Sequence, residues 1–388
     1  MKKILIFSLC LLSGLALSQF LPKALGAEVY PGFSAVAKFT LSVALAFIMI
    51  NVGREFELDK KQWRSYSLDY YVAMMTAALP WIFVAVYYMA LMPKGMFGNW
   101  DAWKENLLLS RFAAPTSAGI LFAMLAAVGL KTSWVYKKIQ TLAIFDDLDT
   151  ILLMVPLQIF MVGLQWELLI IVLVVFILLF IGWNKLNAYK LPQRWYHVLG
   201  YGLGVVLLSD LIYKSTQLFL PNGVHIEILL PAFVLGMVMR NKHYEKESDL
   251  KVSSVISYLF MFLVGMSMPV FIGGGLGEVS GDSVSSRLVM SWGEIALHVL
   301  VVTVLSNLGK LYPLLHYRDR KISERLAIAF GMFTRGEVGA GIIFIAIGYN
   351  IGGPLLAISV LTIVSNLILT GFFIVVVRKL ALRSQAKC

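Results

Sequence analysis

The chain has 388 residues, of which 59% are hydrophobic and only 14% are charged, and its formal net charge is +11. This composition excludes a mainly soluble protein, because its apolar runs are long enough to cross a bilayer core of roughly 30 Å as helices. The two cysteines, Cys10 and Cys388, lie at opposite ends and predict neither a disulfide framework nor a metal site.

We predict an all-α membrane protein with about twelve transmembrane helices in a single polytopic domain, residues 1–388. The first span has an alternative interpretation as a cleaved signal peptide, since Lys2 and Lys3 precede its apolar core and small residues follow it near Gly26. Cleavage would leave eleven spans with the same orientation. The predicted spans are roughly 4–21, 34–53, 68–92, 107–128, 139–162, 166–183, 196–214, 224–240, 253–272, 289–315, 324–348 and 353–378.

Lysine and arginine residues are distributed unequally between the alternate loops that these spans define. Most lie on the side that also carries both termini, while the loops of the other side hold only Lys23, Lys94, Lys104 and Arg287. Positive residues stay on the cytoplasmic side of a membrane. We therefore expect a bacterial inner-membrane protein with both termini in the cytoplasm. The basic net charge reflects this topology, and nucleic acid is not an expected partner.

Two of the predicted spans are interrupted. The fourth span, 107–128, contains Pro115, which removes a backbone donor and clashes with the preceding turn. The eleventh span, 324–348, contains several glycines and two opposite charges, Arg335 and Glu337, near its middle. For either span alone, a simple kink or a glycine-rich packing face is the alternative interpretation.

The positions of the two interruptions predict an internal symmetry. Each is the fourth helix of a five-helix unit, spans 1–5 and spans 8–12, and these units begin on opposite sides of the membrane. Broken helices at matching positions of inverted repeats are the best sequence indication of a transporter's binding site near the bilayer midplane. We therefore expect two inverted five-helix repeats in which broken helices 4 and 11 cross. No residue-level repeat is visible, so the symmetry is one of topology.

Three aspartates, Asp146, Asp147 and Asp149, lie in the otherwise apolar fifth span. Carboxylates at membrane depth are costly and mark ion or proton pathways. Asp146 and Asp149 share a helix face, whereas Asp147 points about 100° away. One face can therefore meet a fixed partner while the other faces a cavity. This helix is the first place to look for function.

Lys310 in the tenth span is a candidate partner for Asp146. Each lies eight residues from a cytoplasmic basic residue, Arg318 and Lys138 respectively, which places both roughly 12 Å inside the membrane. Their common depth and opposite charges favour an ion pair between helices. The alternative is a lysine whose long stem lets its ammonium reach the inner surface.

The aspartates and the broken helices together predict a cation site. A carboxylate can hold a cation with oxygens from Thr116, Ser117 and freed backbone carbonyls, which hard cations such as Na⁺ prefer. The same carboxylate can take up a proton when the cation leaves. We do not expect an enzyme or a cofactor, because the five histidines form no ligand spacing and Cys10 has no partner.

Short sequence motifs spread over nearly the whole chain resemble the monovalent cation/proton antiporter superfamily, in its paired-aspartate branch. The resemblance is carried by Gly53 to Asp59 (GREFELD), Pro115-Thr116-Ser117, Asp146-Asp147 and Arg335-Gly336-Glu337, and by Lys310 after Leu308-Gly309. It implies that Asp147 carries the ion and the proton, and that Asp146 pairs with Lys310. Asp149 is not part of the family pattern, so its role is open.

The resemblance also implies a division of the chain by movement. A transport core of about 68–162 and 289–378 would move against a scaffold of about 4–53 and 196–272 that forms a homodimer. We expect a secondary antiporter that exchanges H⁺ for a monovalent cation by alternating access, and Na⁺ is the cation that we expect. The alternatives are a K⁺/H⁺ antiporter, a sodium-coupled organic-solute symporter on a similar scaffold, and a passive gated cation channel.

Overall fold

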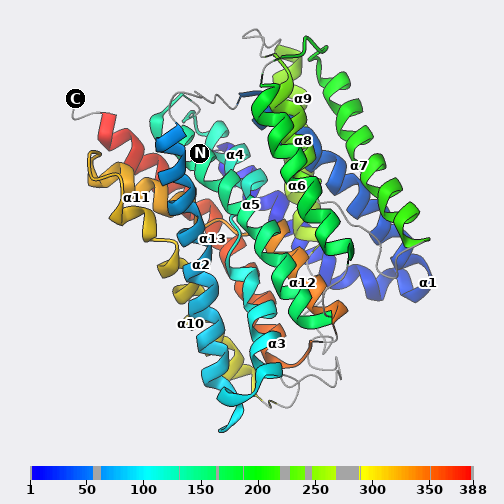
Figure 1. Ribbon diagram of the computed structural model, residues 1–388, viewed down its shortest axis with the longest axis vertical. Helices are drawn as coiled ribbons and strands as arrows, with labels where there is room; N and C mark the ends of the chain where they lie inside the picture. Colours follow the sequence, from blue (N-terminus) through cyan, green and yellow to red (C-terminus); the bar gives the residue numbers. More distant parts are fainter. Residues whose placement is uncertain are drawn as a thin grey trace. The chain divides into compact units, whose positions relative to one another are not determined.

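The structure of the protein is a computed structural model that describes residues 2–55, 63–130, 132–162, 166–186, 188–218, 228–240, 247–267, 288, 290–349 and 351–385. Within these residues every regular element is helical, apart from one isolated bridge between Tyr189 and Met239, which confirms the all-α prediction. The main helices, labelled in Figure 1, are α1 (Lys2–Glu55), α2 (Trp63–Leu91), α3 (Trp100–Ser110), α4 (Ala118–Ala127), α5 (Trp134–Val162), α6 (Trp166–Asn184), α7 (Trp195–Gln217), α8 (Leu229–Val238), α9 (Glu247–Met266), α10 (Trp292–Gly309), α11 (Ile322–Gly331), α12 (Glu337–Gly348) and α13 (Pro354–Gln385).

These helices follow the predicted spans in order. α1 contains the first two spans, and its only break is at Gly26, where φ is 73°, a left-handed conformation that favours glycine. The sequence predicted a loop between these spans, whereas helix continues through Pro22 and Pro31. The two interrupted spans are each built from two shorter helices, α3 with α4 and α11 with α12.

By length and composition, eight helical segments of the described chain can cross a membrane. The apolar parts of α6 and α12 are shorter, and α8 has 10 residues. The chain is therefore a multi-pass membrane protein. The inverted relation of its two five-helix halves stays a prediction.

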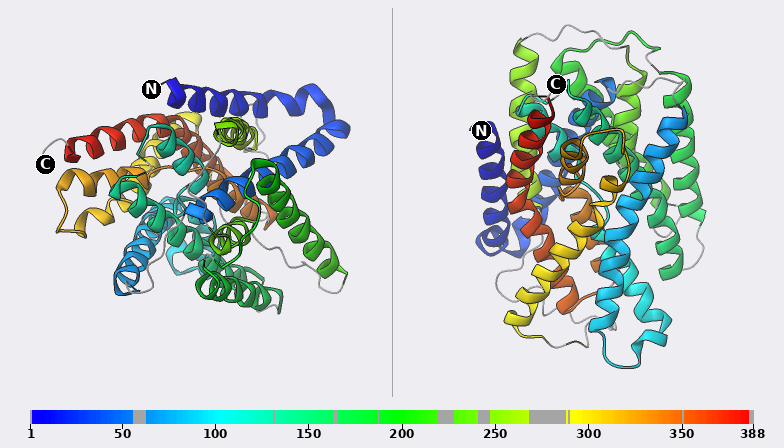
Figure 2. Two further views of the ribbon diagram at one scale, coloured as in Figure 1. Left: turned by 90° about the horizontal axis from the view of Figure 1, so that it is seen from above. Right: turned by 90° about the vertical axis from the view of Figure 1, so that its left-hand side faces the viewer.

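The chain forms two compact units. The first comprises Met1–Phe20, Gln62–Met161 and Gly265–Cys388, and it contains both interrupted spans and the acidic helix α5. In it α10 packs against α2 and α13, and α11 packs against α13 (Figure 1). α2 and α3 form a helical hairpin through the short 3-10 helix Met96–Gly98 (Figure 2).

The span formed by α3 and α4 lies inside the first unit. Of its most apolar stretch, 94% is buried, against 39% for the span of α10. Non-helical backbone at membrane depth is tolerated only where protein or a water-filled cavity surrounds it. The burial of this span therefore explains how its interruption can exist.

The second unit comprises Leu21–Lys61 and Val162–Val264. In it α1 and α8 cross closely, since a Cβ added to Gly53 would overlap the backbone carbonyl of Phe233, and one added to Gly236 would overlap that of Ile50. Small residues at such crossings let two helix backbones approach closely in a membrane. The predicted division into a moving core and a scaffold concerns motion, and it stays a prediction.

The crossing of α1 and α8 leads to a stability prediction. Gly236→Ala should lower the thermal unfolding midpoint of the detergent-solubilised protein, because the new methyl group forces two helices apart at a cost of about 1–3 kcal/mol. Gly204→Ala on α7 is the matched control, since nothing lies within 4 Å of an added Cβ there. Equal midpoints for the two variants would show that the close crossing does not contribute to stability.

Candidate functional site: an ion pair at two broken helices

The first interruption follows α3. The 3-10 helix η3 (Arg111–Ala113) continues α3, and the chain then leaves the helical path, so that Ser117 is extended with φ of −72° and ψ of 96° before α4 begins. Pro115 contributes to this departure, because it has no N–H with which to continue the helical hydrogen bonds. The backbone groups of this segment must find partners outside their own helix.

The second interruption lies between α11 and α12, and it meets the first. The backbone N–H of Ser117 donates to the carbonyl of Thr334 at 3.0 Å. A Cβ on Gly336 would lie 2.7 Å from the side chain of Ile120 and 2.8 Å from Oγ of Ser117. The two breaks therefore cross in direct contact, and a larger residue at position 336 would require the side chains of Ile120 and Ser117 to shift.

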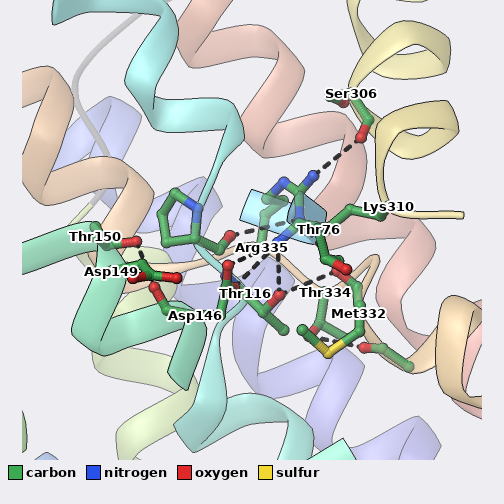
Figure 3. Close-up of polar contacts among 12 residues, drawn as sticks. Thr76, Thr116, Asp146, Asp149, Thr150, Ser306, Lys310, Met332, Thr334 and Arg335 are labelled. Carbon is green, nitrogen blue, oxygen red and sulfur yellow. Dashed lines mark hydrogen bonds and ion pairs between the residues drawn. The ribbon is translucent and has the colours of Figure 1, made fainter. Parts of the chain in front are cut away.

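Arg335 satisfies the carbonyls that the breaks leave free. Its Nη1 donates to the carbonyls of Met332 at 3.2 Å and Pro115 at 3.4 Å, and its Nη2 donates to the carbonyl of Ser306 at 3.4 Å. Its side chain is only 1% exposed. A single guanidinium thus joins both interruptions to α10, as Figure 3 shows.

The centre of the site is an ion pair between Lys310, at the end of α10, and Asp146 on α5. Nζ of Lys310 lies 3.0 Å from Oδ2 and 3.2 Å from Oδ1 of Asp146, and it also donates to Oγ1 of Thr116 at 3.0 Å. The backbone N–H of Thr116 donates to Oδ2 of Asp146 at 2.7 Å. All three residues are fully buried. The structure thus joins the two groups that the sequence placed at one depth (Figure 3).

The remaining predicted site residues lie close by along the chain. Asp147 follows Asp146 on α5 and is 2% exposed, and Ser117 is 1% exposed. Glu337 begins α12, but its side chain lies outside the described part. Asp149 is one turn further along α5, where its Oδ1 accepts a hydrogen bond from the hydroxyl of Tyr70 at 2.7 Å.

Two buried charged residues of the first unit were not predicted as site residues. Arg111 is fully buried, and its Nη2 donates to the backbone carbonyl of Asp149 at 3.0 Å. Asp69 on α2 is 1% exposed and binds Nζ of Lys138, 2.8 Å away. The rule that flagged the aspartates, a charge inside an apolar span, would also have singled out Arg111.

The contact between Asp69 and Lys138 anchors the beginning of α5. The hydroxyl of Tyr317, in the loop before α11, also donates to Asp69 at 2.7 Å, and the ammonium of Lys138 lies 5.1 Å from the centre of the Tyr317 ring. Burial raises the pKa of Tyr317, and the charge of Asp69 raises it further, so the phenol keeps its proton. α2, α5 and the loop before α11 are thereby tied together.

This arrangement can bind and release a small cation. It offers carboxylate, hydroxyl and carbonyl oxygens in a buried place, and its ammonium can be displaced from Asp146 by another positive charge. In the part of the chain that the structure describes, no group of three His, Cys, Asp or Glu residues is arranged to hold a resident metal ion.

Comparisons with known proteins bear on the family and the fold of the chain. A family model described as "Sodium/hydrogen exchanger, transmembrane" matches residues 3–379. No curated protein sequence matches the chain. Among solved structures, the chain resembles that of the sodium proton antiporter MjNhaP1 from Methanocaldococcus jannaschii, a structure at pH 8. The TM-score is 0.59 and the sequence identity is 13%, and the match covers 97% of this chain and 92% of that chain. At this identity the likeness shows the fold alone.

The ion pair leads to a second stability prediction. Lys310→Met should destabilise the protein by about 3–5 kcal/mol, because it leaves the buried Asp146 without its counter-charge. Adding Asp146→Asn should recover most of this loss, since the amide oxygen can still accept from Thr116. Lys104→Met is the control, because Lys104 pairs with an aspartate whose side chain is 69% exposed, and such pairs contribute about 1 kcal/mol or less. Thermal unfolding in detergent measures all three; equal losses for the two lysine variants would contradict the account.

Proposed function

The chain belongs to the family of transmembrane sodium/hydrogen exchangers, and from this premise we propose that it exchanges Na⁺ for H⁺ by alternating access. Membership of this family makes the protein a multi-pass transporter, and not an enzyme, whose substrates are a monovalent cation and the proton. Na⁺ as the cation, the residues that bind it and the mechanism of access belong to the proposal.

The observation that carries the proposal is the buried network at the crossed breaks. Nζ of Lys310 lies 3.2 and 3.0 Å from the two carboxylate oxygens of Asp146. Asp147, the next residue on α5, is also buried. A buried ion pair is strongly destabilised when one partner is removed, but an incoming cation replaces the charge that Lys310 withdraws. The network can therefore exist in a cation-free and a cation-bound form.

In the proposed cycle, Asp147 binds the cation and the proton alternately. Na⁺ reaches the deprotonated carboxylate and completes its shell with oxygens of Thr116, Ser117 and backbone carbonyls, as hard cations prefer. The same positive charge releases Lys310 from Asp146. When Na⁺ leaves, Asp147 takes up a proton and Lys310 returns. Cation and proton compete for one carboxylate, so they are carried in opposite directions.

Alternating access requires the site to face each side of the membrane in turn. We propose that the core, about 68–162 and 289–378, moves against the scaffold, about 4–53 and 196–272, and that the scaffold forms a homodimer. The excess of basic residues in alternate loops supports cytoplasmic termini in a bacterial inner membrane. The site itself lies within the first unit, so it can move as one body.

The proposal predicts that Asp147 is indispensable. Asp147→Asn should abolish sodium-driven proton movement in proteoliposomes while leaving the unfolding midpoint close to that of the unchanged protein, because the amide is isosteric but binds neither a cation nor a proton in exchange. Asp101→Asn, at the exposed beginning of α3, is the control and should transport normally. Normal exchange by Asp147→Asn would remove Asp147 from the site. Parallel runs with K⁺ and Li⁺ identify the cation.

The release of Lys310 predicts a net movement of charge. If Lys310 loses its proton when Na⁺ binds, two protons exchange for one cation, and a sodium jump should produce a current from protein adsorbed on a supported membrane. Lys310→Gln should weaken this current while leaving some exchange through Asp147. Robust Na⁺/H⁺ exchange without any current would show that Lys310 keeps its proton and that Asp147 exchanges one for one.

A further inference from the structure

A second set of buried charges, Arg111 and Asp149, lies next to the ion site and has no part in the cycle described above. Arg111 is 0% exposed and Asp149 is 2% exposed. Arg111 belongs to η3 at the first break, and Asp149 lies one turn after Asp146 on α5. Uncompensated charges are costly at membrane depth, so each of them needs a partner.

The contacts of Arg111 leave its charge only partly compensated. Its Nη2 donates to the backbone carbonyl of Asp149 at 3.0 Å, and its guanidinium carbon lies 4.6 Å from the centre of the Trp81 ring. Nε and Nη1 have no hydrogen-bond partner among the described residues. A guanidinium stays protonated in proteins. Arg111 therefore requires a neighbouring anion.

Asp149 is the candidate anion, because Arg111 already binds its backbone carbonyl. Its Oδ1 accepts from the hydroxyl of Tyr70 at 2.7 Å, a hydrogen bond that suits an ionised oxygen. Its Oδ2 is buried and meets no donor within the described chain. Asp146, the other aspartate on this helix face, is already bound to Lys310. Figure 3 shows the two aspartates one turn apart on α5.

We propose that Arg111 and Asp149 are a compensating charge pair that tunes the ion site from outside it. Asp149 stays ionised opposite Arg111 through the whole cycle, and it does not carry the exchanged proton. The pair sets the electrostatic potential at Asp147, and thereby the relative affinity of this carboxylate for the cation and the proton. This inference rests on the proposed function, since it assigns a positioning role in that same exchange.

The balance of charge around the pair supports this role. The groups that act on the pair electrostatically are Tyr70 from α2 and Asp146 from α5, and Asp146 is in turn bound to Lys310 at the end of α10. Among the described buried residues of the two breaks, α5 and the end of α10, the cations Arg111, Lys310 and Arg335 stand against the carboxylates Asp146, Asp147 and Asp149. Removing either member of the pair therefore leaves one unit of uncompensated charge beside the site, of opposite sign in the two cases.

The test compares Asp149→Asn, Arg111→Gln and the double variant in proteoliposomes. Asp149→Asn leaves an extra positive charge, which favours loss of the site proton and repels Na⁺. The pH of half-maximal exchange should fall by on the order of one unit, the effect of a unit charge across roughly 10 Å at an effective dielectric constant of about 20. The apparent KM for Na⁺ at alkaline pH should rise about tenfold for the same reason.

Arg111→Gln should shift both quantities in the opposite directions, and the double variant should return both close to the starting values. A purely structural role would not produce shifts of opposite sign. Arg111→Lys keeps the charge and should keep the pH profile, and Asp101→Asn is the exposed control. The proton-to-cation ratio, measured from the reversal potential, should be the same in the double variant as in the unchanged protein.

Three results would overturn the inference: shifts of the same sign in the two single variants, a double variant no better than the worse single one, or a proton-to-cation ratio that falls by one. If the single variants fold poorly, thermal unfolding decides, because the double variant should then be more stable than either. An unchanged protein that exchanges no cation for protons would refute the proposed function itself, which separates the two failures.

Discussion

The buried contact between Lys310 and Asp146 is the interaction on which the rest of the site depends. Two charges that are fully removed from water incur a large desolvation cost, which their attraction offsets only when further hydrogen bonds satisfy them. Thr116 provides these bonds, through its backbone N–H to Asp146 and its hydroxyl to Lys310. Both groups are free because the helix is broken there. The ion pair therefore needs the break, and the break needs the ion pair.

The neighbouring packing fixes the backbone around the ion pair, but another cation can still take the place of the Lys310 ammonium. Gly309, directly before Lys310, lies so close to the backbone of Pro80 on α2 that a side chain would overlap it, which sets the position of the end of α10. Arg335 holds both breaks through three carbonyls. The backbone around the pair is thus held by packing and hydrogen bonds, whereas the ammonium of Lys310 is held only by hydrogen bonds and charge. A cation that supplies the same charge can replace it.

Much of the fold follows from the sequence, because apolar runs and charged flanks determine where helices cross a membrane. The pairing of Asp146 with Lys310 was accessible for a similar reason, since depth can be counted along helices from charged ends. The partners of Asp149 could not be predicted from the sequence. Tyr70 is 79 residues away in the chain, and its approach depends on how α2 and α5 rotate against each other. The sequence placed a loop between the first two spans, whereas helix continues through Pro22 and Pro31 on either side of the break at Gly26.

The central claim is that a cation and protons compete for one buried carboxylate beside a displaceable ion pair. Proton release on cation binding tests it most directly, by titrating the detergent-solubilised protein with NaCl in a weakly buffered solution containing a pH indicator, with choline chloride as the control. The account predicts that Na⁺ binding releases protons in proportion to site occupancy and that Asp147→Asn releases none. Saturable Na⁺ binding to the unchanged protein without proton release would contradict it.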